Sequence, residues 1–125
     1  MPRKQSITLT EAELRLMNIL WQRGPATVHQ IQQALVGPEL AYNSVLTTIR
    51  ILEKKGYVKH VKDGRAHVYE PTIGQRDATR FEIRNLVSRF FRDSHEALVL
   101  NILEDESLDE KELKRLKDLI AGRKP

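Results

Sequence analysis

The chain has 125 residues, 40% of them hydrophobic and 30% charged, which is enough apolar material for one compact domain or two small modules. It has no cysteine and no apolar run long enough to span a bilayer, so disulfides, thiolate metal sites and membrane insertion are excluded and we expect a cytoplasmic protein. The net charge of +4 comes from residues 1–74, where 10 Lys and Arg stand against 6 Asp and Glu, and this local excess favours a polyanionic partner.

The first predicted helix begins near Glu11, because Thr10 and Glu13 have the spacing of a capping box. Gly24 and Pro25 are expected to end it, since glycine can form a left-handed turn and proline cannot continue a helix. The expected inward face carries apolar side chains at helical spacing, namely Leu14, Met17, Leu20 and Trp21.

Two more short helices are predicted after the first. Thr27 and Gln30 repeat the capping-box pattern and open the second helix, which Gly37 is expected to close. The third helix is predicted from about residue 41 to residue 55, with Gly56 as its C-terminal cap. Its inward stripe consists of Val45, Ile49 and Leu52.

A β-hairpin is predicted next. The segments 57–62 and 65–70 are rich in Tyr and Val and flank Asp63-Gly64, a dipeptide favoured in two-residue type I′ turns. The expected cross-strand pairs near the tip are Lys62 with Arg65 and His60 with His67. Helix, turn, helix and then a basic hairpin is the order of a winged helix, whose later helix enters the major groove of DNA. We therefore expect a winged helix-turn-helix DNA-binding domain over residues 1–72.

The outward side of the third helix carries hydrogen-bonding side chains. Asn43, Ser44 and Thr47 are predicted to contact bases, because Asn pairs with adenine and Thr offers a hydroxyl or a methyl group to thymine. The cations predicted to contact phosphates are Arg50, Lys54, Lys62 and Arg65. Arg3 and Lys4, ahead of the first helix, are candidates for an additional contact.

Residues 73–125 form a second predicted domain, which is helical, so the whole fold is expected to be mainly α with one small hairpin. Helices are predicted around residues 81–91, over residues 97–106, and after a capping box formed by Ser107 and Glu110. The first of these is too apolar on several sides for one small packing partner. Another surface must therefore cover it.

Three other functions fit parts of the sequence: catalysis, metal binding and protein docking. Asp93, Ser94 and His95 have the residue types of a hydrolase triad, but adjacent residues cannot face one another as a triad requires, so no catalytic residue is expected. His60 and His67 could share a metal ion, but no third ligand stands nearby in the sequence, so a surface or DNA-backbone role is favoured and neither a metal site nor a cofactor is expected. A winged helix can also dock a protein without reading DNA, although the polar and cationic outward face argues against this. Each polar residue taken singly could also belong to an ordinary solvated helix face.

Three stretches of the chain carry a family resemblance: TEAELRLMNILWQRGPATVHQIQQAL, LAYNSVLTTIRILEKKGYV and KDGRAHVYEP. They resemble the penicillinase-repressor family, also called BlaI/MecI, and the likeness runs over nearly the whole chain. The resemblance implies a homodimeric transcriptional repressor that binds a palindromic operator in double-stranded DNA, commonly ahead of antibiotic-resistance or stress genes. A two-fold dimer reading two half-sites fits such a palindrome.

The resemblance also implies that the C-terminal helices form the dimer. The residues assigned to dimerisation are Phe81, Leu86, Phe90, Leu98, Ile102, Leu113, Leu116 and Ile120. In the resistance branch of the family, a membrane sensor with a metalloprotease domain triggers cleavage of the repressor in this module, which makes such a sensor, or another signalling protein, a candidate partner. The bond from Asn101 to Ile102 occupies the matching place, but the family sequence has an aromatic residue after the Asn. Ile102 is alternatively a dimer-core residue, and induction by proteolysis or by a ligand both stay open.

Overall fold

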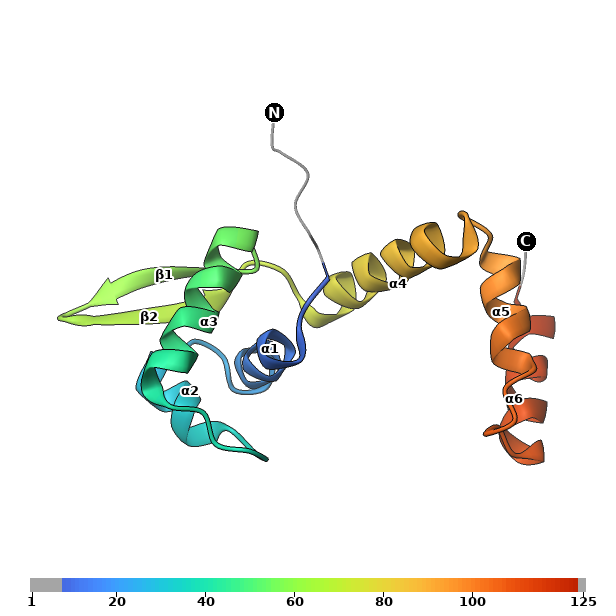
Figure 1. Ribbon diagram of the computed structural model, residues 1–125, viewed down its shortest axis with the longest axis horizontal. Helices are drawn as coiled ribbons and strands as arrows, with labels where there is room; N and C mark the ends of the chain where they lie inside the picture. Colours follow the sequence, from blue (N-terminus) through green and yellow to red (C-terminus); the bar gives the residue numbers. More distant parts are fainter. Residues whose placement is uncertain (1–7, 124–125) are drawn as a thin grey trace. The chain divides into compact units, whose positions relative to one another are not determined.

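The structure, a computed structural model, describes residues 8–123 (Figure 1). Its elements in chain order are α1 (Glu11–Arg23), α2 (Val28–Ala34), α3 (Tyr42–Lys55), β1 (Val58–Asp63), β2 (Ala66–Pro71), α4 (Gln75–Phe91), α5 (His95–Leu103) and α6 (Glu110–Ala121). Three helices followed by a two-stranded antiparallel hairpin make a winged helix-turn-helix, and three more helices follow it. The prediction of a mainly α fold with one small hairpin is confirmed. Arg3 and Lys4 lie outside the described residues.

Side-chain caps set where the first two helices begin, as the sequence predicts. The Thr10 hydroxyl accepts the Glu13 N–H at 3.1 Å while the Glu13 carboxylate accepts the Thr10 N–H at 2.9 Å. Thr27 and Gln30 form the same reciprocal pair at the start of α2. At the other end of the motif, Gly56 closes α3 in a left-handed conformation with a φ of 89°.

Two details of the first helices differ from the prediction. Leu14 is exposed, because the buried face of α1 turns toward Leu16 and Met17 instead. α2 ends at Ala34, since the N–H of its C-cap Leu35 bonds to the Gln32 carbonyl, so the chain leaves the helix before it reaches Gly37.

The C-terminal helix starts also need correction. α5 begins at His95 rather than at residue 97, with Ser94 as its N-cap. α6 is capped by Asp109, whose carboxylate accepts the Glu112 N–H at 2.8 Å, and not by Ser107. The Ser107 hydroxyl is already engaged, because it donates to Asp105 at 2.8 Å.

The hairpin forms with a different register from the one expected. Its turn residues are Gly64 and Arg65, so Lys62 lies opposite His67 and His60 lies opposite Tyr69. The predicted pairs of Lys62 with Arg65 and of His60 with His67 are therefore wrong. Gly64 has a φ of +65° whereas Arg65 is not among the residues with positive φ, a pattern that fits a type II′ turn and not the type I′ turn expected. The shift spans an even number of residues, so every side chain keeps its expected face.

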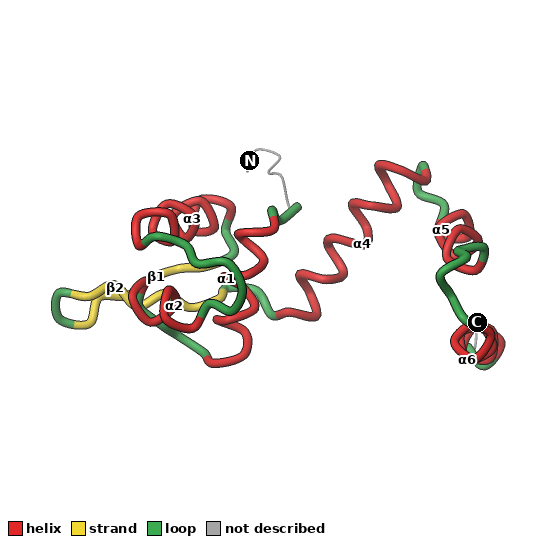
Figure 2. The backbone as a smooth tube through the Cα atoms, turned by 60° about the horizontal axis from the view of Figure 1, so that its bottom comes forward, coloured by secondary structure: helices red, strands yellow, loops and turns green. Residues whose placement is uncertain are grey.

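The helices α1, α2 and α3 lie together with the hairpin (Figure 2), and one hydrophobic core joins them to the base of the hairpin. Its fully buried side chains are Leu16, Met17, Leu20, Ile31, Val45, Ile49 and Leu52. The segment before α2 pairs with the hairpin, because the N–H and carbonyl of Ala26 bond to the carbonyl and N–H of Tyr69 at 2.9 and 2.8 Å. This pairing fixes Tyr69, and with it the register of the hairpin, against the helices.

The chain divides into two compact units, the first ending at Asn85 and the second beginning at Leu86. The beginning of α4 belongs to the first unit, where the Glu82 carboxylate accepts the Leu9 N–H at 2.9 Å. The domain boundary was predicted after residue 72, just before α4. The sequence pattern indicates where α4 begins, but it does not indicate the contact between Glu82 on α4 and Leu9 near the N-terminus. None of the helices in the described part of the chain combines the length and hydropathy needed to cross a membrane.

Candidate nucleic-acid interface

The outward side of α3 is mostly polar, although Tyr42 and Ile51 on the same helix are exposed as well. The buried residues of the helix are Val45, Ile49 and Leu52. Asn43, Ser44 and Thr47, predicted to contact bases, are all exposed, and together with Thr48 they line a shallow depression of about 350 Å³. Sequence reasoning did not select Thr48, whose hydroxyl donates to the Ser44 carbonyl at 2.8 Å. The structure therefore brings the expected base-contacting residues together on one face.

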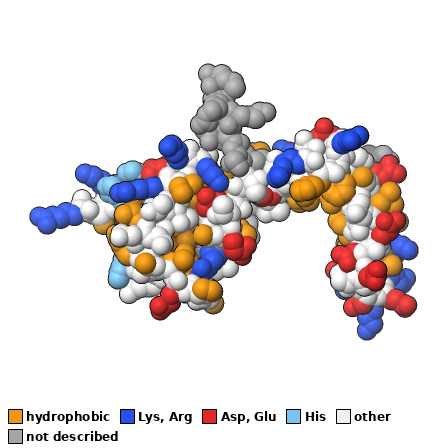
Figure 3. Space-filling model, viewed as in Figure 1, with side chains coloured by type: hydrophobic (Ala, Val, Ile, Leu, Met, Phe, Trp, Pro, Cys, Tyr) orange, Lys and Arg blue, Asp and Glu red, His pale blue; other side chains and the backbone are white. Residues whose placement is uncertain are grey.

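The cations expected to contact phosphates surround this face. They are Arg50 and Lys54 on α3, Lys62 on β1 and Arg65 in the hairpin turn, and all are exposed. Within residues 8–123, none of them belongs to a recorded ion pair. Figure 3 shows Lys and Arg side chains gathered at the hairpin end of the first unit. Their charge is therefore available to an anionic partner.

Two other lysines of the same stretch have carboxylate partners. The Lys55 Nζ lies 2.8 Å from a Glu13 oxygen, with only 18% and 5% of the two side chains exposed. The Lys59 Nζ lies 3.4 Å from a Glu70 oxygen on the neighbouring strand. These pairs remove two charges that the sequence alone would count toward the basic surface.

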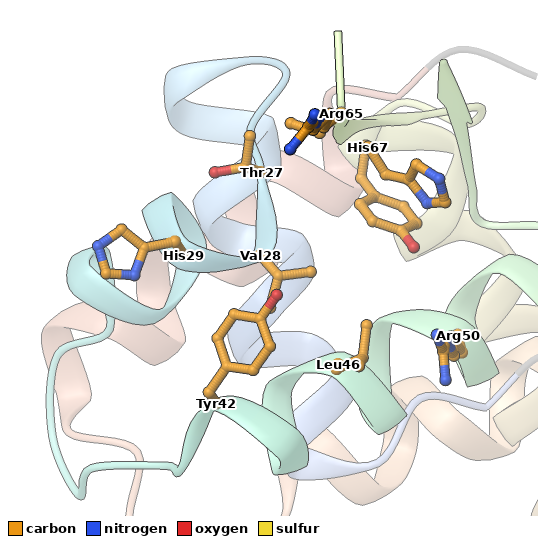
Figure 4. A pocket seen from close by; sticks show the side chains of 10 residues that line it. Thr27, Val28, His29, Tyr42, Leu46, Arg50, Arg65 and His67 are labelled. Atoms are coloured by element: carbon orange, nitrogen blue, oxygen red, sulfur yellow. The ribbon is translucent and has the colours of Figure 1, made fainter. Parts of the chain in front are cut away.

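A groove of about 390 Å³ separates α3 from the hairpin (Figure 4). Its lining residues are Thr27, Val28, His29, Tyr42, Leu46, Arg50, Arg65, Ala66, His67 and Tyr69. Arg50 and Arg65, predicted separately, meet in this groove, and none of the lining residues is an Asp or a Glu. Tyr42 was missed as a site residue, and the place of His67 in this groove was not predicted, because both depend on how the helices and the hairpin pack. The correct hairpin register would have been the only sequence signal for His67.

The hairpin turns one of its faces toward α3. Lys62, His60, His67 and Tyr69 share this face by their register. The rings of His60 and His67 are stacked, with centroids 4.3 Å apart and planes 14° from parallel. His60 Nδ1 also lies 2.7 Å from a carboxylate oxygen of Glu53 on α3. The two histidines are thus neighbours, although as a diagonal pair and not as the directly opposed pair expected.

Tyr69 forms the buried floor of the groove. Burial raises the pKa of its phenol above the ordinary value of 10.0; Glu53 adds to the rise and Arg50 opposes it. The phenol is therefore neutral at physiological pH and adds no negative charge to the groove. An anion entering the groove meets the cations and hydroxyl groups of the lining without a nearby phenolate.

In the second unit, large apolar side chains are exposed. Phe90 is 65% exposed, and Leu86, Ile102 and Ile120 are exposed as well. Of the other residues assigned to dimerisation, Leu98, Leu113 and Leu116 are half-buried, while Phe81 is exposed and lies in the first unit. Leu119 on α6, which is not among the residues assigned to dimerisation, is 70% exposed.

The residues considered for cleavage and for catalysis lie near α5. Asn101 and Ile102 are both exposed on this helix, and the Asn101 amide donates to the Ala97 carbonyl at 3.0 Å. Ser94 uses its hydroxyl to cap the same helix, where it accepts the Ala97 N–H at 3.0 Å. Across residues 8–123 no group of three or more His, Cys, Asp or Glu side chains is arranged to hold a metal ion.

The protein is a winged helix-turn-helix in which the outward face of α3 lies beside a groove lined in part by Arg50 and Arg65. The family model described as "Penicillinase repressor" matches residues 9–122, and the chain belongs to this family.

Relatives and a solved structure agree with the family. The penicillinase repressor of Bacillus licheniformis is 26% identical over 117 residues, which cover 93% of this chain and 91% of that protein. The transcriptional regulator BlaI of Mycobacterium tuberculosis is 33% identical over 119 residues, or 91% of this chain and 86% of the relative. The chain is similar to the solution structure of the DNA-binding domain of the repressor BlaI, with a TM-score of 0.51, 28% identity, and coverage of 59% of this chain and 93% of that one. The predicted family is confirmed.

Proposed function

We propose that this chain, a DNA-binding transcriptional repressor, occupies a palindromic promoter operator as a homodimer and leaves it when its C-terminal helices are disrupted. The observation that carries the proposal is the exposed face of α3, with Asn43, Ser44 and Thr47 side by side next to unpaired cations. Repression arises because the bound dimer excludes RNA polymerase from the promoter. The protein performs no chemistry in this account, and it works where promoter DNA lies, in the bacterial cytoplasm.

Base reading is assigned to the N-terminal half of α3. Asn43 can donate to and accept from adenine, and Ser44 and Thr47 offer hydroxyl groups that suit several bases. Ala41 caps α3 without a side-chain hydrogen bond, so the first N–H groups of the helix are not occupied by a capping side chain. Recognition helices commonly approach base edges with this end, which supports the assignment.

Phosphate contacts are assigned to Arg50, Lys54, Lys62 and Arg65. These side chains are exposed and stand on α3 and the hairpin, which would straddle the edge of a major groove. Such contacts set the position of the protein and the salt dependence of binding, and they carry no sequence information themselves.

Dimerisation is assigned to the helical domain of residues 73–125. Phe90, Leu86 and Ile120 expose apolar surface in the single chain, and a second copy can cover it. Once one half-site is bound, the second winged helix meets its half-site at a high effective concentration, so the dimer binds much more tightly than a monomer. Loss of the dimer therefore releases the operator without any change in the reading face.

Release is assigned to events in the dimerisation domain. The bond between Asn101 and Ile102 is the candidate cleavage site for a sensor protease, and both residues are exposed on α5 of the single chain. Since the helix would have to open for a protease to act, a ligand or another signalling partner that separates the dimer is the alternative. Incubation with a sensor metalloprotease of the kind found in the resistance branch of the family, followed by mass spectrometry of the products, separates the two routes.

A fluorescence-anisotropy titration tests the function. Purified protein is titrated against a palindromic fragment of its own promoter and against a scrambled duplex of equal length, at several salt concentrations. We expect the promoter to bind about a thousandfold more tightly, with an affinity that falls steeply as salt rises. Equal and weak binding to both duplexes contradicts the proposal and favours a winged helix that docks a protein.

A further inference from the structure

The groove between α3 and the hairpin contains a histidine, His67, that is not among the residues assigned above to bases or phosphates. His67 is exposed, lines the groove with Arg50 and Arg65, and lies opposite Lys62 on the hairpin (Figure 4). Among residues 8–123 the structure records ring contacts for His67 with His60 and Tyr69, but no hydrogen bond or ion pair. Its ring nitrogens are therefore open to a ligand that enters the groove.

The neighbouring histidine differs in this respect. His60 Nδ1 lies 2.7 Å from a carboxylate oxygen of Glu53, so Glu53 already provides a partner for one end of the stacked pair. The Glu53 side chain is about one-third exposed, and it is absent from the lining of the groove. In the stacked pair, the imidazole of His60 therefore contacts the Glu53 carboxylate, while the imidazole of His67 lines the groove.

The chemistry of the groove suits a phosphodiester. Guanidinium groups of Arg50 and Arg65 can bind phosphate oxygens, and the hydroxyls of Thr27 and Tyr42 can donate hydrogen bonds. Val28 and Leu46 offer apolar contact of the kind that a deoxyribose ring accepts. A strand of DNA whose bases face the outward side of α3 would bring its backbone past this groove.

We propose that His67 is a phosphate contact whose protonation is coupled to operator binding, so that the affinity for DNA rises as the pH falls. The proposal rests on the DNA-binding function given above and adds a regulated contact to the same interface. A phosphate beside an imidazole stabilises its charged form, and histidine is the side chain that changes charge between pH 5 and 8. The complex then holds more protons than the free protein, and linkage requires tighter binding at lower pH.

Other charged and titratable groups also face His67, and their effects must be separated from its own. They line the groove or adjoin the stacked histidines: His29 on α2, Tyr42, Arg50 and Glu53 on α3, His60 and Lys62 on β1, Arg65 in the hairpin turn, and Tyr69 on β2. Histidine is the side-chain type that acts as a proton switch near neutral pH. A histidine-by-histidine comparison therefore identifies the group that takes up the proton.

The experiment measures operator affinity by anisotropy from pH 5.5 to pH 8.5 at constant ionic strength. For the wild type we expect affinity to fall by about three- to tenfold between pH 6 and pH 8, within the range that one charge-assisted phosphate contact allows. His67→Gln, which cannot gain a proton, should flatten this dependence and bind at all pH values about as the wild type does at pH 8. His67→Arg carries a permanent charge and should flatten the dependence at the tighter level.

Matched variants keep the test specific. His29→Gln changes another histidine of the groove, and His95→Gln changes one in the second unit; both should retain the wild-type dependence on pH. A wild-type affinity that does not vary with pH, or a His67→Gln variant that keeps the full dependence, overturns the proposal while leaving the DNA-binding function intact. Absence of operator binding at every pH contradicts both.

Discussion

The Nζ of Lys55 lies 2.8 Å from the Oε1 of Glu13, and this ion pair ties the last turn of α3 to the first turn of α1. The same Glu13 oxygen accepts the Thr10 N–H that completes the capping box, so one carboxylate holds both a helix start and a helix end. Lys55 also donates to the Thr8 carbonyl at 3.1 Å. The recognition helix is therefore anchored at its C-terminal end by contacts that leave its outward face free.

Replacing Glu13 with alanine should destabilise the first unit. The change leaves the mostly buried Lys55 ammonium without its carboxylate and removes half of the capping box, so we expect the free energy of unfolding to fall by about 3 kcal/mol. Urea denaturation followed by circular dichroism measures the loss. Glu11→Ala, a change at an exposed residue in the same turn, should lower the free energy of unfolding by less than about 1 kcal/mol. Equal losses of stability for the two variants would show that the ion pair between Glu13 and Lys55 does not stabilise the first unit.

The stability of the first unit should fall at high pH through Tyr69. Because burial and Glu53 raise the pKa of this phenol above 10.0 in the folded protein, the unfolded chain ionises first as the pH rises. The stabilisation is complete below pH 10 and is lost as the pH rises through the higher pKa of the folded state. Thermal melts between pH 8 and pH 11 should show a smaller drop for Tyr69→Phe than for the wild type, and parallel curves would exclude this contribution.

Local signals in the sequence predicted most of the winged helix. Thr10, Thr27 and Gly56 act within one turn of the chain, and each forms the cap expected of it. The outward face of α3 could be predicted from helical periodicity, which is also a local signal. The spacing of the buried positions along the helix determines which residues lie on the opposite side.

Features that depend on distant contacts could not be predicted in this way. The hairpin turn moved by one residue because Tyr69 pairs with Ala26, a contact between segments 43 positions apart. Lys55 does not contribute a free charge to the basic surface, because it forms an ion pair with Glu13 on α1. The position of His67 in the groove depends on how the hairpin packs against α3. After the end of α4, Arg92 and Asp93 have φ values of 50° and 67°. This left-handed turn could not be predicted, because neither position is a glycine.

The exposed ring of Phe90 gives a direct test of the dimer. Since 65% of this residue is exposed in the single chain, Phe90→Asp should leave the fold of each protomer intact and act only where a second copy covers the ring. We expect monomers by sedimentation at concentrations where the wild type is dimeric, and operator affinity at least 100-fold weaker. Phe90→Leu, which keeps an apolar side chain, should remain dimeric. A Phe90→Asp protein that binds the operator tightly as a dimer would refute the assignment of this surface.

We propose that the outward face of α3 reads the base sequence of an operator, and a comparison of Asn43→Ala with Arg65→Ala tests this. Both residues are exposed, but one is assigned to bases and the other to a phosphate. Affinities for the operator and for single-base variants of it, measured by anisotropy at several salt concentrations, separate the two roles. We expect Asn43→Ala to lose about 1–3 kcal/mol of discrimination at one base pair, whereas Arg65→Ala should weaken binding to all duplexes alike and lower the salt slope by about one. If both variants keep the wild-type preference among duplexes, or both lose it equally, the face of α3 does not read the operator as proposed.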